Sequence, residues 1–252
     1  MSIELNHIYN MDCLDGMRQM EDKSIDLVLA DPPFGTTQNG WDTPILLDAL
    51  WKELIRIKKE NTAVVLFGSG MFTAEVMISN PKMWKYNLIW EKGERATGFL
   101  NANKMPLRSH EDIMVFYQRL PTYNPQFTRG YPTHKRDAPS IVNNTYGDFK
   151  TISHREYGNQ KFPKSVLKFD KPHPPIHPSE KPVDLCEYLI KTYSNENDTV
   201  LDFCIGSGTT AEASIRTGRQ FIGFEKEKVY FDVAQIRIKK AQEQDKLGEW
   251  FE

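Results

Sequence analysis

The segment TVLDFCIGSGTT, residues 199–210, decides the fold of the chain. Its first six residues form an apolar run typical of a buried strand, and the glycines after them allow a tight turn into a helix expected over 211–216. The first amides of such a helix face a ligand at the positive end of the helix dipole. Glu225 ends the next apolar run, about 20 positions after the turn, where an acid can accept hydrogen bonds from ribose hydroxyls. We favour a site for an adenosine-type ligand here, and a purely structural strand-to-helix turn is the alternative.

Strands and helices are expected to alternate on both sides of a central segment. Apolar runs predict further buried strands at 25–30, 62–68, 87–90, 112–117 and 220–225. Helices are expected over 42–59, over 182–193 and from the last strand to about residue 244. This alternation predicts an α/β fold with a mostly parallel sheet, helices on both faces and ligands at the carboxyl ends of the strands.

The central segment, residues 118–176, shows no clear periodicity and is interpreted as a loop-rich insert. Between Arg119 and Lys171 it carries ten basic and four acidic residues, whereas the whole chain has a formal net charge of −2. This local positive charge suits a phosphate-backbone partner, although a solvated loop region has the same composition. We therefore expect one domain formed by 1–117 and 177–252, and an insert between its two parts.

Cysteine and hydropathy patterns limit the function classes. Cys13, Cys186 and Cys204 are far apart, which argues against a disulfide framework and against a cysteine-based zinc site. The histidines lack the spacing of a metal site, so no metal is expected. No apolar run approaches the roughly 20 residues that span a bilayer, and the N-terminus does not resemble a signal peptide. A cytoplasmic protein without a membrane partner is expected.

The motif Asp31-Pro32-Pro33-Phe34 directly follows the strand expected at 25–30. Two prolines supply no N–H, so this corner offers a carboxylate and carbonyl oxygens with few competing donors. The Asp31 carboxylate and the Pro32 carbonyl can each accept a hydrogen bond from the exocyclic amine of a nucleobase, which localises the nitrogen lone pair and stabilises the positive charge of methyl transfer. Phe34 can stack on a base flipped out of the duplex. The alternative is a rigid turn with a capping aspartate.

These motifs together resemble the amino-methyltransferases of DNA. Their catalytic motif, Asp/Asn/Ser-Pro-Pro-Tyr/Phe, is matched at 31–34, and their cofactor motif, Asp-Pro-Phe-x-Gly-Ser-Gly-Thr-Thr, is matched at 202–210. Their His-Pro-x-x-Lys-Pro element is matched at 177–182, and their N-terminal Gly-Asp-Cys segment resembles 10–14. Because the catalytic motif comes first, the order resembles the β class. The resemblance implies a circularly permuted, Rossmann-like methyltransferase sheet with a target-recognition segment at 118–176.

The resemblance also implies roles for individual residues. The catalytic residues are Asp31, Pro32, Pro33 and Phe34. The cofactor S-adenosyl-L-methionine is expected to contact Asp12, Cys13, Lys181, Asp202, Phe203, Cys204, Gly206, Gly208, Thr209, Thr210 and Glu225. The DNA-binding candidates, from the densest basic and aromatic cluster of the insert, are Arg129, Lys135 and Arg136. The loop 35–42, which includes Trp41, is expected to lie over the catalytic pocket.

Three positions depart from the family pattern. Phe203-Cys204 stands where Pro-Phe is usual, so the aromatic side chain has moved by one position. Met11 replaces a glycine before Asp12, and Phe34 replaces the commoner tyrosine, which keeps the ring but removes a hydroxyl.

The function implied is site-specific methylation of adenine N6 on a flipped-out base of double-stranded DNA. Asp31 favours adenine, because cytosine-N4 relatives more often carry serine there. Methylation of cytosine N4 or of an RNA base, a non-catalytic nucleic-acid-binding protein and a nucleotide-dependent oxidoreductase remain alternatives. A bacterial or phage-encoded enzyme, a homodimer and a separate restriction enzyme as partner are further expectations.

Overall fold

The computed structural model describes residues 3–35, 40, 42–130, 159–175 and 179–248. Its contacts divide the chain into two compact units, one of Met1–Asn124 with Ser165–Glu252 and one of Pro125–Lys164. In the smaller unit, β6 (Thr128–Arg129) pairs antiparallel with β7 (Gln160–Lys161). All other helices and strands described below belong to the larger unit. None of the helices in these described ranges has the length and apolar content needed to span a bilayer.

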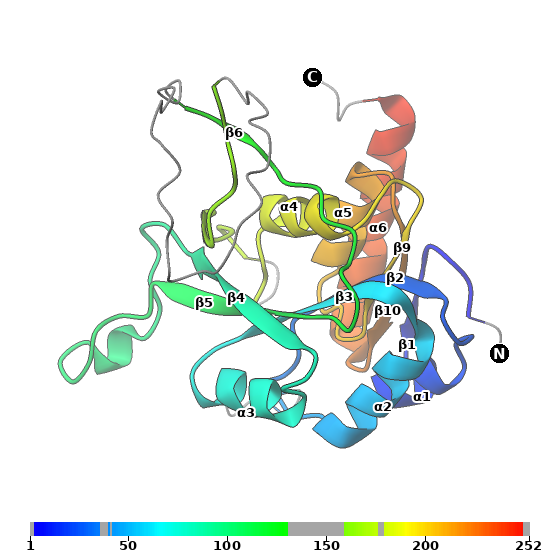
Figure 1. Ribbon diagram of the computed structural model, residues 1–252, viewed down its shortest axis with the longest axis horizontal. Helices are drawn as coiled ribbons and strands as arrows, with labels where there is room; N and C mark the ends of the chain where they lie inside the picture. Colours follow the sequence, from blue (N-terminus) through cyan, green and yellow to red (C-terminus); the bar gives the residue numbers. More distant parts are fainter. Residues whose placement is uncertain (1–2, 36–39, 41, 131–158, 176–178, 249–252) are drawn as a thin grey trace, which may run out of the picture. The chain divides into compact units, whose positions relative to one another are not determined.

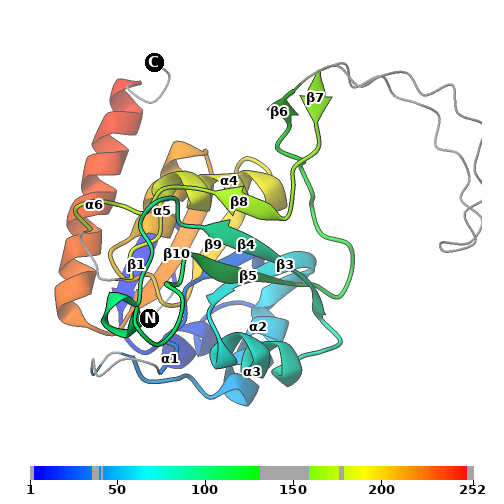
Figure 2. The same cartoon turned by 90° about the vertical axis from the view of Figure 1, so that its left-hand side faces the viewer.

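The larger unit is built on a sheet in the order β1-β10-β9-β2-β3-β5-β4-β8 (Figures 1 and 2). Its strands are β1 (His7–Asn10), β2 (Ile25–Ala30), β3 (Lys58–Gly68), β4 (Trp84–Glu91), β5 (His110–Phe116), β8 (Val166–Lys168), β9 (Thr199–Asp202) and β10 (Gln220–Glu225). Among the described pairings of this eight-stranded sheet, only those of β5 with β3 and β4 are antiparallel. The predicted mostly parallel α/β sheet is confirmed.

Helices cover both faces of this sheet (Figure 2). They are α1 (Cys13–Arg18), α2 (Leu47–Ile57), α3 (Met71–Ser79), α4 (Val183–Tyr193), α5 (Thr209–Arg216) and α6 (Lys228–Leu247). Successive strand side chains point to opposite faces, so Val28 packs with α1, α2 and α3, while Leu27 and Leu29 pack with α4 and α5. This two-sided burial explains the uninterrupted apolar run of β2.

Some element boundaries differ from the predicted ones. The helix predicted over 42–59 begins only at Leu47, because Pro44 interrupts the preceding segment and Asp42 accepts a hydrogen bond from the Gly35 amide at 2.8 Å. It ends at Ile57, because Lys58 is extended and pairs with Ile25 of β2. The short strand β8 lies inside the insert predicted at 118–176 but pairs with β4 of the large sheet.

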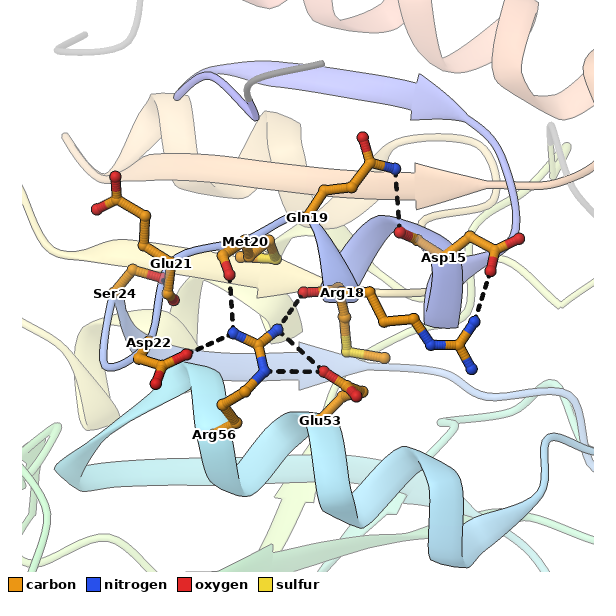
Figure 3. Close-up of polar contacts among 10 residues, drawn as sticks. Asp15, Arg18, Gln19, Met20, Glu21, Asp22, Ser24, Glu53 and Arg56 are labelled. Carbon is orange, nitrogen blue, oxygen red and sulfur yellow. Dashed lines mark hydrogen bonds and ion pairs between the residues drawn. The ribbon is translucent and has the colours of Figure 1, made fainter.

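Arg56 on α2 fastens the segment that follows α1 (Figure 3). Its guanidinium donates to the Met20 and Met17 carbonyls at 2.8 and 2.6 Å and contacts Asp22 and Glu53 at 2.6 and 2.9 Å. The side chain is 30 % exposed, so the two carbonyl contacts give positional order more than stability. They tie α1, and with it Asp12 at its N-terminus, to α2.

Replacing Gly16 with alanine is expected to lower the free energy of unfolding by about 1–3 kcal/mol. Gly16 is the residue through which α1 approaches the sheet, and a Cβ there would lie 2.3 Å from Cε1 of the buried Phe224 ring. The gain in helix propensity from glycine to alanine, about 1 kcal/mol, does not offset this overlap. Urea denaturation measures the change, and an unchanged midpoint would contradict the tight packing of α1.

Candidate active site

One cavity of about 370 Å³ lies at the carboxyl ends of β2, β9 and β10. The chain leaves β2 toward β3 and leaves β9 toward β10, so neighbouring strands β2 and β9 form a topological switch point, where open α/β sheets bind ligands. The cavity brings together most residues predicted for the two motifs, namely Asp12, Cys13, Asp31, Pro32, Pro33, Phe34, Lys181, Asp202, Phe203, Cys204, Gly206, Thr209, Thr210 and Glu225. The catalytic and cofactor candidates therefore share one space.

The two glycines of the turn after β9 have different tasks. Gly206 has φ +52° and lines the cavity, and a Cβ there would meet no atom within 4 Å. Gly208, the predicted cofactor residue that does not line the cavity, has φ +87° and precedes α5. A Cβ at Gly208 would lie 3.2 Å from the Ala234 Cα, so this glycine permits α6 to approach the turn. Gly206 instead keeps the cavity open.

Acidic side chains are among the predicted cofactor residues that line the cavity. Glu225 at the end of β10 accepts hydrogen bonds from the backbone amides of Gly206 at 2.9 Å and Glu227 at 2.7 Å. Burial raises its pKa in spite of these two donors. Asp12 caps α1 by accepting from the Leu14 amide at 2.9 Å. Each carboxylate is thus fixed by the backbone while lining the cavity, as hydroxyl recognition requires.

The end of β9 carries the third carboxylate of this side. Asp202 accepts from the Cys204 amide at 3.0 Å, and burial raises its pKa to about 7. Phe203, the aromatic shifted by one position, is 1 % exposed and packs in the core between the sheet and α1. The thiol of Cys204 is hydrogen-bonded to that of Cys13. This hydrogen bond and burial raise the pKa of the Cys204 thiol. Both cysteines line the cavity.

Asp31 lies directly after β2, the strand that pairs with β9. Its Oδ2 atom is 2.5 Å from the Lys181 ammonium, whereas its buried Oδ1 atom has no hydrogen-bond partner among the described residues. Burial raises the pKa of Asp31 to about 6, although the Lys181 charge opposes this shift. Asp31 therefore has one oxygen bound to Lys181 and one unpaired oxygen that can accept a hydrogen bond from an N–H donor.

Lys181 contacts two carboxylates of the protein itself. Its side chain is 7 % exposed, and its ammonium also lies 3.3 Å from Glu111 Oε2. Glu111 Oε1 in turn lies 2.7 Å from the ammonium of Lys92. Burial alone would lower the pKa of Lys181, but Asp31 and Glu111 together raise it. Asp31, Lys181, Glu111 and Lys92 thus form a row of alternating charges. The predicted contact of Lys181 with a cofactor carboxylate remains a proposal.

Lys92 and Glu111 were not predicted as site residues. Glu111 lies on the same face of β5 as Ile113 and Val115, because alternate residues of a strand share a face. Ile113 and Val115 are fully buried under α4. An acidic residue in register with two core positions of a strand is the signal that identifies it, because such a charge is buried only with a partner.

Phe34 has one face occupied by the protein. Its ring stacks on Phe72 of α3, with centroids 4.8 Å apart and an interplanar angle of 27°. The Lys181 ammonium lies 6.0 Å from the Phe34 centroid. The stack fixes the orientation of the ring, and stacking of a flipped base on its other face remains a proposal.

Several predicted residues fall outside this site. Arg129 is exposed on β6 of the smaller unit. The candidates Lys135 and Arg136, the residues 36–39 and 41 of the predicted loop, and His177 of the His-Pro-x-x-Lys-Pro element lie outside the described residues.

Replacing Glu111 with glutamine is expected to shift the acidic limb of the pH–activity profile to lower pH. Activity should fall as the pH drops through about 6, because a protonated Asp31 loses its charge and an acceptor oxygen. The negative charge of Glu111 raises the pKa of Asp31, so its removal moves that fall to more acidic pH. The pH dependence of kcat/KM checks this, with Glu60→Gln, at an exposed ion pair with Arg119, as control. Superimposable profiles of the three proteins would contradict the coupling.

The fold and cavity define the chain as an α/β protein of the methyltransferase fold. The structure resembles that of the PvuII cytosine-N4-specific DNA methyltransferase with a TM-score of 0.69, 16 % identity and coverage of 97 % of this chain and 93 % of the other. It also resembles M1.HpyAVI, solved in complex with SAM, with a TM-score of 0.62, 22 % identity and coverage of 92 % and 98 %.

A family model described as DNA methylase matches residues 25–236, and the chain belongs to this N6/N4 DNA methylase family. Among its curated relatives, the type II methyltransferase M1.MboII of Moraxella bovis is 26 % identical over 92 % of this chain and 96 % of the relative. The DNA adenine methyltransferase YhdJ of Escherichia coli K12 is 25 % identical over 93 % of this chain and 83 % of the relative. The predicted family and enzyme class are confirmed.

Proposed function

We propose that the chain transfers the methyl group of S-adenosyl-L-methionine to N6 of adenine at specific sites in double-stranded DNA. The observation that carries this proposal is the buried Oδ1 atom of Asp31, which has no hydrogen-bond partner among the described residues and belongs to the same cavity lining as the Gly206 turn. The relative YhdJ is named as a DNA adenine methyltransferase. An aspartate at the first motif position also favours adenine over cytosine within the resemblance.

The residues of the cavity fit the proposed cofactor. Glu225 and Asp12 offer carboxylate oxygens for ribose hydroxyls, and the open space at Gly206 admits a ligand close to the backbone. The side chains of Cys13, Cys204 and Phe224 add an apolar part to the wall. When bound, the cofactor supplies an electrophilic methyl group. No step requires a metal, because acceptor oxygens stabilise the developing positive charge.

The protein's own contribution to transfer centres on Asp31. Its Oδ1 atom accepts one N–H of the base amine and the Pro32 carbonyl accepts the other, so the lone pair of the nitrogen is released from the ring. Lys181 holds Oδ2 and thereby the orientation of the carboxylate. The partial positive charge on the nitrogen is stabilised by the ionised Asp31, which requires a pH above its pKa of about 6.

Cytosine N4 is the second candidate, because the same acceptor pair serves any exocyclic amine. Incubation of the purified protein with tritium-labelled cofactor and either DNA or RNA, followed by nucleoside analysis, separates the candidates. The proposal predicts N6-methyladenine in DNA, and N4-methylcytosine alone, label in RNA alone or no label would overturn it. Modification-sensitive sequencing of DNA from expressing cells then identifies the recognition sequence.

The proposals for DNA contact, partners and location rest on the sequence. The insert, with Arg129, Lys135 and Arg136, is proposed to contact the DNA backbone, because its positive charge complements phosphate. A homodimer, a separate restriction enzyme as partner and a location in the bacterial cytoplasm remain proposals of the same kind.

A further inference from the structure

The chain between β4 and β5, residues 92–109, forms a hairpin that projects beyond the ends of both strands (Figure 1). Thr97 and Arg108 exchange two backbone hydrogen bonds of 2.9 Å across it. At the tip, the left-handed Gly98, φ +91°, leads into the 3-10 helix η1 (Phe99–Asn101), and the Lys104 amide closes the turn on the Asn101 carbonyl at 2.8 Å. The β4–β5 hairpin is thus an ordered element held by its own backbone.

This ordered tip exposes large apolar side chains. Phe99 is 76 % and Leu100 84 % exposed, and Met105 and Leu107 nearby are 55 % and 47 % exposed. Single exposed apolar residues are ordinary, but a group of four within nine positions marks an interaction surface. The tip needs a partner that accepts apolar side chains.

The charges around the tip narrow the kind of partner. Arg95, Lys104 and Arg108 on the hairpin are exposed, and Glu94 is the only acidic residue of 93–109. Apolar side chains flanked by cations complement a polymer that has stacked apolar rings inside and phosphate groups outside. A DNA duplex has this arrangement, since base faces are apolar and each nucleotide carries a negative charge.

The base of the hairpin lies close to the cavity of Asp31, because Phe34 lines both that cavity and the one that the hairpin lines. Thr97 and Arg108 line a second cavity, of about 160 Å³, together with Phe34 and Glu111. Lys92, where the hairpin begins, contacts Glu111 at 2.7 Å, and Glu111 contacts the lysine that holds Asp31. A duplex whose target base reaches Asp31 therefore passes close to the hairpin.

We propose that Phe99 and Leu100 form a wedge that enters the base stack beside the target and fills the space the flipped base leaves. This inference rests on the proposed function. Extruding a base costs stacking and pairing energy, and apolar side chains that replace the lost stacking offset part of that cost. Arg95, Lys104 and Arg108 then hold the adjacent phosphates. The wedge assists extrusion, so its contribution depends on how firmly the target base is paired.

The test compares a Phe99→Ala/Leu100→Ala double variant with wild type on two duplexes that carry the identified recognition sequence. In one duplex the target adenine is paired, and in the other it faces an abasic position. We expect the single-turnover methylation rate of the variant to fall about 10- to 100-fold on the paired duplex and to return to within about threefold of wild type on the abasic duplex. Ile78→Ala, at a 76 % exposed position on α3, is the control and should match wild type on both.

Each other outcome overturns the inference. An equal loss on both duplexes would show a role other than extrusion, and no loss on either would show that the tip does not enter the DNA. Conversion of a wild-type dimer to a monomer by the double variant, measured by sedimentation, would assign the tip to contact between two copies of the chain. Absence of methylation by wild type on any DNA contradicts the proposed function instead, so the two failures are distinguishable.

Discussion

Replacing Asp31 with alanine is expected to lower the single-turnover rate of methyl transfer about 1000-fold while cofactor affinity changes less than about threefold. The Oδ1 atom is buried and has no hydrogen-bond partner among the described residues. The substitution removes both the proposed acceptor for the base amine and the charge proposed to stabilise transfer. The cofactor contacts proposed for Glu225, at the end of β10, and for Asp12, at the N-terminus of α1, stay intact.

The Asp31→Ala variant is expected to fold, because the buried Lys181 ammonium keeps Glu111 as a partner at 3.3 Å. Breaking a buried ion pair without such a second partner is strongly destabilising. Thermal unfolding monitored by circular dichroism checks this, and isothermal titration with the cofactor checks binding. Asp31→Asn, which keeps an acceptor oxygen but not the charge, should fall between wild type and alanine. Transfer by Asp31→Ala at the wild-type rate would refute the role of Asp31.

Replacing Gly206 with leucine is expected to weaken cofactor binding about 100-fold. Gly206 lines the cavity at φ +52°, and nothing lies within 4 Å of the position of its Cβ. A side chain there occupies the space proposed for the cofactor. The left-handed conformation adds about 1–2 kcal/mol of strain, which by itself would act on stability.

Gly218→Leu is the matched control for this variant. Gly218 has φ +70° and does not line the cavity. The nearest atom to a Cβ at this position would be the Glu196 Cγ, at 4.0 Å. Both variants therefore carry similar backbone strain, and only the Gly206 variant fills the cavity. Equal cofactor affinities of the two variants, measured by titration calorimetry, would contradict the assignment of this cavity to the cofactor.

The central strands and their motifs were predictable because burial on both faces imposes an apolar run. The predicted strands 25–30 and 220–225 agree with β2 and β10 residue for residue. Since carboxyl ends of parallel strands meet at one edge, the residues after β2 and β9 were expected together, and the cavity does bring them together.

Elements whose stability comes from tertiary contacts were missed. Strand β1 has the sequence HIYN, of which only Ile8 is buried. It forms by pairing with β10, and the sequence contains no apolar run that predicts it. The first residues of β3 are the polar stretch KKEN, residues 58–61. The predicted helix over 42–59 includes the first two of them, and the predicted strand over 62–68 begins only after all four. Lys92 and Glu111 come together through the pairing of β4 with β5. Lys181, which lies 150 residues beyond Asp31 in the sequence, joins them only in the folded chain. Sequence spacing alone contains no such information.

The measurement that tests the central claim most directly is a crystal structure of the protein with a cleavage-resistant cofactor analogue and a duplex containing the recognition sequence. The account predicts an extruded adenine whose N6 atom lies about 3 Å from Asp31 Oδ1 and from the Pro32 carbonyl, facing the sulfonium side of the analogue above the Gly206 turn. An analogue bound elsewhere, or a base amine that contacts neither oxygen, would contradict it.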